Sequence, residues 1–208
     1  MIRQLVTSAT YRQSSVITKE HLAKDPENLY FARAPRFRLM GEFVRDQALH
    51  ISGLLNKKFG GPGVKPYQPA GLWNEVSLDR NRKFVQDQGN KIYRRSMYTY
   101  WKRPSPQPAM LAFDTPSREI CTVQRQRTNT PMQALVTLND VQFVEASRFL
   151  AQRVLKSSPQ DLPSRVNRMF ELATGRPADS LRQEVIKKAY DKQKAVFDQN
   201  PAQADQLL

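Results

Sequence analysis

Aromatic and basic side chains are concentrated in one short segment, residues 93–103 (YRRSMYTYWKR). Nucleic-acid bases and sugar rings stack on tyrosine and tryptophan, while arginine and lysine pair with phosphate, sulfate or carboxylate groups. The same composition is typical of a β-strand whose aromatic side chains pack against helices and whose basic side chains face solvent. The segment therefore predicts either a binding surface or such a strand. As a binding surface it would use Arg94, Arg95, Tyr98, Tyr100, Trp101 and Lys102.

A second set of basic residues precedes a predicted helix start at Thr130 and Pro131. Backbone N–H groups at a helix N-terminus attract anions, and guanidinium groups close by strengthen that attraction. We therefore include Arg118, Arg125 and Arg127 among the candidate ligand-binding residues. The alternative interpretation is that these arginines hold a neighbouring loop in place.

Three residues between the two basic groups carry side chains that often take part in catalysis. Asp114 and Glu119 are a candidate carboxylate pair for hydrolysis, and Cys121 is a candidate reactive thiol. A structural interpretation is also open: Asp114 caps a helix, Arg118 pairs with an acid, and Cys121 is a small buried hydrophobic side chain. The spacing assigns no catalytic residue and leaves a hydrolytic or redox enzyme as an alternative function.

Metal and cofactor sites have little support in the sequence. Glu42 and Asp46 lie one helical turn apart, a spacing that suits a divalent cation or pairing with a nearby arginine. Two histidines and a single cysteine are too few for a typical His/Cys zinc site or a disulfide scaffold. The Cys-x-x-Cys-His motif is absent, so we expect no metal site and no haem attached to this chain.

The chain is strongly basic, with a formal net charge of +14 over 208 residues. Half of this excess comes from residues 79–127, which contain eleven basic and four acidic side chains. Such a field attracts polyanions, including nucleic acid, sulfated or acidic polysaccharide, an anionic membrane and an acidic protein partner. The longest apolar runs are far shorter than the roughly 20 residues of a membrane-spanning helix, so we expect no such segment.

The hydrophobic pattern predicts a mainly α fold with a small β-hairpin or strand and long Pro/Gly-rich loops. Residues 92–102 are the best strand candidate. Residues 41–59 show helical spacing, with Val44, Ala48, Ile51, Leu54 and Leu55 as the expected buried stripe. Four further helices are expected: one from a capping box at Thr130 to Gln133, one after Asp140, one from Leu162 to Ala173, and one from Asp179 past Phe197.

The N-terminal forty residues predict shorter elements. Residues 2–6 are interpreted as the tail of a helix, and Thr18 is placed to cap a short helical turn. Asp25 and Pro26 predict the start of another helix.

Several motifs, in this order, resemble one protein family. They are TSATYRQSS (7–15), PRFRL (35–39), RDQAL (45–49), VKPYQP (64–69), GLW (71–73), YRRSMYTYWKR (93–103), FDTPSRE (113–119) and RTNTPMQAL (127–135), followed by LND (138–140) and FVEA (143–146). Together they resemble the domain of unknown function 1553, the Planctomycete-type PSD1 domain, over nearly the whole chain. We expect residues 1–208 to be a fragment of one such domain, truncated at both ends, with a sub-boundary near 104–108.

The resemblance implies a context rather than an activity. Members are typically large exported proteins of Planctomycetes and related bacteria, with a companion domain upstream and often a cytochrome c domain. The resemblance therefore implies an extracytoplasmic location, neighbouring domains as partners, and a c-type haem in another domain of the parent protein. It implies no catalytic residue.

These observations rank three hypotheses. The first is an accessory module that binds an acidic or sulfated polysaccharide, or a partner domain. The second is a hydrolytic or redox enzyme domain that uses Asp114, Glu119 or Cys121. The third is nucleic-acid binding through the basic-aromatic segment, which an exported context disfavours.

Overall fold

The computed structural model describes residues 1–77, 83–157 and 161–207, and the fold is mainly α as predicted. The chain forms two compact units, Met1–Leu39 and Met40–Leu208. Among the described residues, no helix is long and apolar enough to cross a membrane.

The first unit contains two short helices, α1 (Ile2–Thr7) and α2 (Lys19–Lys24). Thr18 caps α2 as predicted: its hydroxyl accepts from the His21 N–H at 3.1 Å, and the His21 ring accepts from the Thr18 N–H at 3.5 Å. This reciprocal pair satisfies N–H groups that the first helical turn leaves without a partner.

The helix predicted from Asp25 is not formed. The buried Asp25 carboxylate instead accepts from the backbone N–H groups of Leu29 and Tyr30, at 2.8 and 2.9 Å. The buried Arg33 guanidinium donates to the carbonyls of Asp25 and Pro26. Because side chains satisfy these backbone groups, the segment closes as a turn rather than continuing as a helix.

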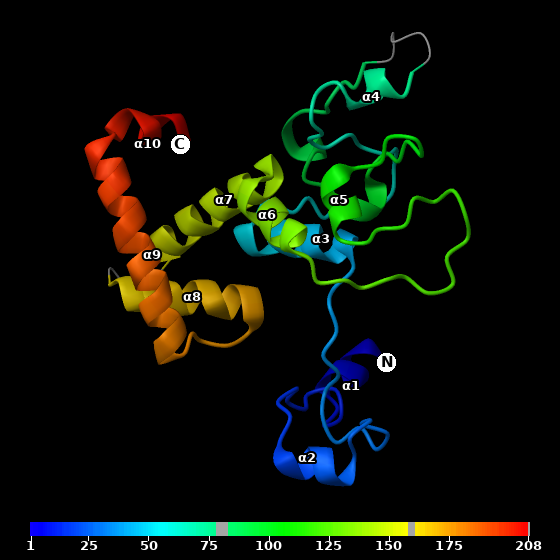
Figure 1. The fold of residues 1–208 in the computed structure, drawn as a ribbon, viewed down its shortest axis with the longest axis vertical. Helices are drawn as coiled ribbons and strands as arrows, with labels where there is room; N and C mark the ends of the chain where they lie inside the picture. Colours follow the sequence, from blue (N-terminus) through cyan, green and yellow to red (C-terminus); the bar gives the residue numbers. More distant parts are fainter. Residues whose placement is uncertain (78–82, 158–160, 208) are drawn as a thin grey trace. The chain divides into compact units, whose positions relative to one another are not determined.

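The second unit is built around a pair of packed helices (Figure 1). Helix α3 packs against α7 and α5, α6 and α8 pack against α7, and α9 packs against α8. The elements in chain order are α3 (Gly41–Ser52), α4 (Leu72–Glu75), the 3₁₀ turns η1 (Gly89–Lys91) and η2 (Ser96–Tyr98), α5 (Pro108–Ala112), α6 (Pro131–Asn139), α7 (Val141–Ser157), α8 (Leu162–Thr174), α9 (Ser180–Gln199) and α10 (Pro201–Leu207).

The buried face of α3 differs from the predicted one. Gly41, Arg45, Leu49 and Ser52 are buried, whereas the predicted stripe through Val44 and Ala48 is only half-buried. The prediction was wrong because it placed the buried face from apolar residues alone, whereas the face that packs in the core includes the charged side chain of Arg45. The helix is also shorter than predicted, since Gly53 adopts a left-handed conformation (φ 87°) that ends α3 after Ser52.

The four predicted C-terminal helices are present and begin close to the predicted residues. Asp161 and Asp179 cap α8 and α9 by accepting backbone N–H groups of the first turn. The predicted capping box at Thr130 is not formed, because the Thr130 side chain makes no capping hydrogen bond; the Gln133 amide donates to the Thr128 hydroxyl at 3.2 Å.

The strand predicted over residues 92–102 is reduced to two isolated bridges, Asn56 with Arg94 and Val64 with Thr99. Between these bridges the chain turns through η2. The Arg45 guanidinium donates hydrogen bonds to the carbonyls of Ile92 and Arg94, so these acceptors are not available for a strand ladder.

Candidate anion-binding site

The basic-aromatic segment is held in place by one buried arginine on α3. Arg45 is 4% exposed and donates to the Ile92 carbonyl at 2.6 Å, the Arg94 carbonyl at 2.9 Å and the Gln142 side-chain oxygen at 2.7 Å. Burial lowers the pKa of Arg45 to about 10, so the guanidinium stays charged at neutral pH. One cation therefore ties α3, α7 and residues 92–96 together.

Arg94 and Tyr98 both contact a neighbouring loop. Arg94 is 4% exposed, donates to the carbonyls of Gly60 and Pro62, and lies 3.9 Å above the Tyr98 ring. The Tyr98 hydroxyl accepts from the Gly60 N–H at 2.8 Å. These contacts fix the glycine-rich loop at residues 60–63, which is a structural use of two predicted ligand-binding residues.

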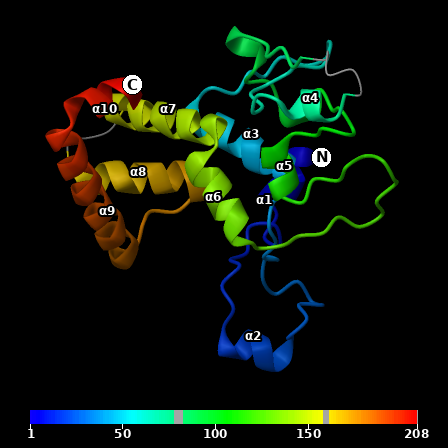
Figure 2. The same ribbon diagram turned by 45° about the horizontal axis from the view of Figure 1, so that its top comes forward.

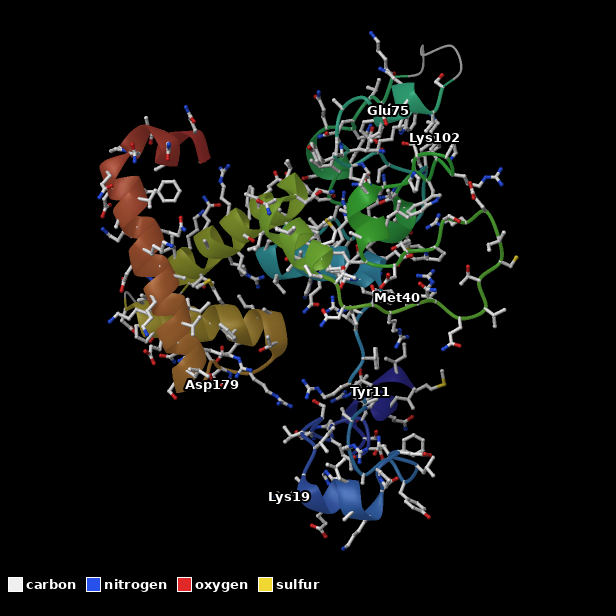
Figure 3. The ribbon with its side chains drawn as sticks, in the orientation of Figure 1. Tyr11, Lys19, Met40, Glu75, Lys102 and Asp179 are labelled. Carbon is white, nitrogen blue, oxygen red and sulfur yellow. The ribbon has the colours of Figure 1, made fainter. Side chains whose placement is uncertain are left out.

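Three of the other predicted arginines line one pocket of about 390 Å³. They come from different segments: Arg95 precedes η2, and Arg118 and Arg125 belong to the connection between α5 and α6. Figures 1 and 2 show this connection extending away from the helices. Figure 3 shows Met40, another lining residue, where the chain enters α3. The remaining lining residues are Glu42, Phe43, Asp46 and Met97.

The two acidic residues of the pocket already have partners. Glu42 accepts from Arg125 with both carboxylate oxygens at 3.0 Å. Asp46 accepts from the Ser96 N–H at 2.7 Å. Each carboxylate therefore holds a neighbouring segment against α3, and each also pairs with an arginine, Glu42 with Arg125 and Asp46 with Arg45 at 3.9 Å. In the described part of the chain, no three His, Cys, Asp or Glu side chains gather as a metal site requires.

Arg118 is exposed and is positioned by an aromatic ring. Its guanidinium lies 4.6 Å from the Trp101 ring centroid, and the Trp101 indole N–H donates to the Ser117 carbonyl at 2.8 Å. Stacking on an aromatic face leaves guanidinium N–H groups at the edge available for an oxyanion. The predicted pairing of Arg118 with an acid has no counterpart among the ion pairs of the described residues.

The connection between α5 and α6 is closed at its base by Asp114 and Thr128. The Asp114 carboxylate accepts from the Thr128 backbone N–H at 2.7 Å and from the Thr128 hydroxyl at 2.8 and 2.9 Å. Asp114 has a left-handed backbone (φ 59°), which aspartate tolerates better than most residues. Asp114 therefore closes the connection rather than capping a helix.

The other two candidate catalytic residues lie on the exposed part of the same connection. Glu119 and Cys121 are both exposed, and none of the described hydrogen bonds or ion pairs joins either side chain to Asp114. The expectation of a buried Cys121 was therefore wrong. The connection projects beyond the helices, where no core covers the thiol.

Arg127 lines a second, more open cavity of about 640 Å³ beside the first. Met40 and Arg125 line both cavities. Tyr100 and Lys102, the remaining predicted residues, lie instead beside Trp73 of α4. The sequence prediction missed Met40, Phe43 and Trp73, because single apolar residues outside a clear periodicity give no signal for a site.

The fold and pocket define a mainly α module whose arginines converge on an open, partly apolar cavity. A family model described as "PSD1: Protein of unknown function (DUF1553)" matches residues 1–190, and the chain belongs to this family. This confirms the resemblance found in the sequence motifs. Comparisons with curated proteins and with solved structures find no match.

Proposed function

We propose that this domain is a binding module that binds the sulfate or carboxylate groups of an acidic polysaccharide. The convergence of Arg95, Arg118 and Arg125 on one 390 Å³ cavity carries the proposal. Planar guanidinium groups match the paired oxygens of carboxylate and sulfate, and cavities of about 300–1,000 Å³ suit small-molecule groups.

The charge balance of the pocket supports an anionic ligand. Glu42 is neutralised by Arg125, whereas none of the carboxylates described here lies within ion-pair distance of Arg95 or Arg118. Both of these arginines are exposed and can meet a ligand without prior rearrangement. Phe43 and Met97 supply apolar surface for the ring that carries the anionic group.

A partner domain is a second candidate ligand, and one observation favours it. Ile120 and Val123 lie on the connection that borders the pocket, and their side chains are 77% and 104% exposed. Large apolar side chains exposed on a projecting loop are typical of protein interfaces. The enzyme alternative has less support, because Asp114 is engaged by Thr128.

The wider context of the domain is proposed from the family resemblance. The domain acts outside the cytoplasm, in an exported Planctomycete-type protein whose c-type haem belongs to another domain. Neighbouring domains of that protein are then its first partners. Cell fractionation and haem staining of the parent protein test this context; a cytoplasmic, haem-free parent would contradict it.

The binding proposal is tested by fluorescence anisotropy at about 150 mM salt, where the Debye length is about 8 Å. The labelled probes are dextran sulfate, polygalacturonate, uncharged dextran and single-stranded RNA. We expect saturable binding of one acidic polysaccharide, weakened about tenfold by Arg95→Gln and by Arg118→Gln, since a charge-assisted hydrogen bond contributes roughly 1.5–3 kcal/mol.

A matched control separates the pocket from the general charge of the chain. Lys187→Gln and Lys192→Gln remove the same charge from exposed positions on α9. Equal weakening by pocket and control variants would show that only the +14 field binds, and would overturn the proposal. Tighter binding of RNA than of either polysaccharide would favour the nucleic-acid alternative. Binding of none of the probes would leave the partner domain as the candidate.

A further inference from the structure

A second cluster of aromatic and basic side chains lies outside the arginine pocket. Trp73 of α4 packs edge-on against Phe84, with ring centroids 5.3 Å apart, and at a tilt against Tyr100, with centroids 5.9 Å apart. Tyr100 is 52% exposed, so part of its ring is open to solvent. Trp101, the next residue, instead contacts Arg118 of the arginine pocket. Two consecutive side chains therefore serve different clusters.

Two lysine ammonium groups converge on this cluster. Lys102 Nζ lies 4.3 Å from the Trp73 ring centroid. Lys65 Nζ lies 5.4 Å from the Trp73 centroid and 5.5 Å from the Tyr100 centroid. Figure 3 shows Lys102 in the same part of the unit as Glu75, the last residue of α4.

The ammonium of Lys102 lacks the partner that a buried charge requires. Its Nζ atom is buried and makes no hydrogen bond to the residues that the structure describes. Within the described residues, no carboxylate lies within ion-pair distance of Lys102 or Lys65. Aromatic faces offset part of the cost of a buried cation, but they do not replace hydrogen bonds to an anion.

A pocket of about 350 Å³ lies on the Trp73 and Phe84 side of the cluster. Amide side chains are well suited to sugar hydroxyl groups, because each amide offers donors and an acceptor. The polar residues that line the pocket are Gln68, Asn74, Lys83 and Gln86. An aromatic wall, several amides and nearby lysine ammonium groups suit a ligand with a flat apolar face, hydroxyl groups and a negative charge.

We propose that the Trp73–Tyr100–Lys102 cluster is a second binding site, which takes a sugar ring carrying a carboxylate or sulfate group. The ring lies against the exposed face of Tyr100, and the anionic group pairs with the ammonium of Lys102. This inference deepens the proposed function, on which its ligand class rests, because it adds recognition of the sugar ring itself to the recognition of charge.

The position of the lysines favours an acidic sugar over a nucleic-acid base. Lys102 already occupies the space above one face of the Trp73 ring, so a base stacking there would have to displace a buried cation. A sugar ring lies instead against the exposed face of Tyr100, which leaves that cation in place above Trp73.

The two tryptophans of the chain make the two sites separately observable. Trp73 belongs to the lysine cluster, Trp101 contacts Arg118 of the arginine pocket, and the chain contains no other tryptophan. In a ¹⁵N-labelled sample each indole N–H gives its own NMR signal, which Trp73→Phe and Trp101→Phe assign. The probes are trigalacturonate, glucuronate, glucose, sodium sulfate and a short ribo-oligonucleotide.

We expect glucuronate and trigalacturonate to shift the Trp73 signal saturably, and glucose and sulfate alone to shift it at least tenfold more weakly. Lys102→Met removes the charge while keeping the apolar stem, so the fold is retained and the dissociation constant for glucuronate rises at least tenfold. Tyr100→Ala, at a half-exposed position, gives a similar loss. Arg95→Gln, in the other pocket, leaves the Trp73 response unchanged.

The outcomes separate this inference from the proposed function. Shifts at Trp101 alone would overturn the second site while supporting the arginine pocket, and shifts at Trp73 alone would do the reverse. An unchanged glucuronate response in Lys102→Met, or a stronger Trp73 response to the oligonucleotide than to either acidic sugar, would also overturn the second site. A lack of response at either indole would overturn both.

Discussion

Arg45 and Gln142 lie 97 residues apart in the sequence, and a 2.7 Å hydrogen bond between their side chains joins α3 to α7 inside the core. The same guanidinium holds the carbonyls of Ile92 and Arg94. A hydrophobic contact between the two helices would tolerate small rotations, whereas this donor set specifies the direction of each partner. The basic-aromatic segment therefore has its orientation set from the core.

Arg45→Met is expected to lower the free energy of unfolding by roughly 3–5 kcal/mol, because it leaves several buried acceptors without a donor. Urea unfolding followed by circular dichroism measures the change. Lys187→Met, an exposed substitution on α9, is the control and should stay within about 0.5 kcal/mol of the wild type. A loss below about 1 kcal/mol in Arg45→Met would show that water or other groups satisfy these acceptors.

Arg94 and Arg95 are neighbours with opposite expected behaviour. Arg94→Ala should destabilise the fold by about 2–4 kcal/mol, since it removes donors from the carbonyls of Gly60 and Pro62 and the stacking on Tyr98. Arg95→Ala should leave stability within about 0.5 kcal/mol and weaken polysaccharide binding. Parallel unfolding and anisotropy titrations test the pair. Equal stability effects would contradict the division of roles.

The sequence predicted the elements whose signals are local. Asp161 and Asp179 mark the starts of α8 and α9, because their side chains accept the backbone N–H groups of Ser164 and Arg182; the helix starts could therefore be placed without tertiary information. The buried face of α3 could not be placed, because the partners of Arg45 come from positions about fifty and a hundred residues away. For the same reason the sequence could not tell Arg94 from Arg95: the chemistry is identical, and only the fold decides which side chain meets carbonyl groups.

Stability above pH 10 is expected to depend on Tyr93. Burial, together with a 2.7 Å hydrogen bond to Glu145, raises the pKa of Tyr93 to about 12, from an ordinary value of 10. Below pH 10 both states hold the phenol proton, and this stabilisation is complete. Between pH 10 and 12 the unfolded state loses the proton first, so stability falls as the pH rises.

Tyr93→Phe isolates this contribution. Urea midpoints at pH 9, 10 and 11 should fall more steeply with pH in the wild type than in Tyr93→Phe, because the other alkaline groups are common to both proteins. Parallel pH profiles would show that the pKa of Tyr93 is the same in the folded and unfolded states.

Gly41→Ala should destabilise the fold through a steric clash at the start of α3. A Cβ atom on Gly41 would lie 2.5 Å from the Thr115 hydroxyl and 3.0 Å from both the Met110 carbonyl and Phe113 Cβ. Overpacking of this kind costs about 1–3 kcal/mol. Gly63→Ala is the control, because its nearest neighbour would be at an ordinary 3.4 Å. The thermal unfolding midpoints of both variants test this prediction. A higher midpoint in Gly41→Ala than in the wild type would mean that α5 moves away from α3 without a loss of stability.

Asp114→Ala should open the connection between α5 and α6 without unfolding the helices. It removes the hydrogen bonds to Thr128 and places alanine at a left-handed φ of 59°, so a loss of about 2–3 kcal/mol in the stability of the connection is expected. Asp114→Asn keeps an acceptor and tolerates the backbone, and should lose less.

Limited trypsin digestion measures how far the connection opens, because trypsin cleaves after arginine faster in an opened connection than in a closed one. Cleavage after Arg118, Arg125 and Arg127 should accelerate in Asp114→Ala more than in Asp114→Asn, while cleavage within α7 stays slow. Because the same opening moves two arginines of the pocket, binding of the acidic polysaccharide should weaken in the same order. If Asp114→Ala abolished binding without faster cleavage, Asp114 would have to contact the ligand directly. Closure of the connection explains a loss of binding only when cleavage becomes faster as well.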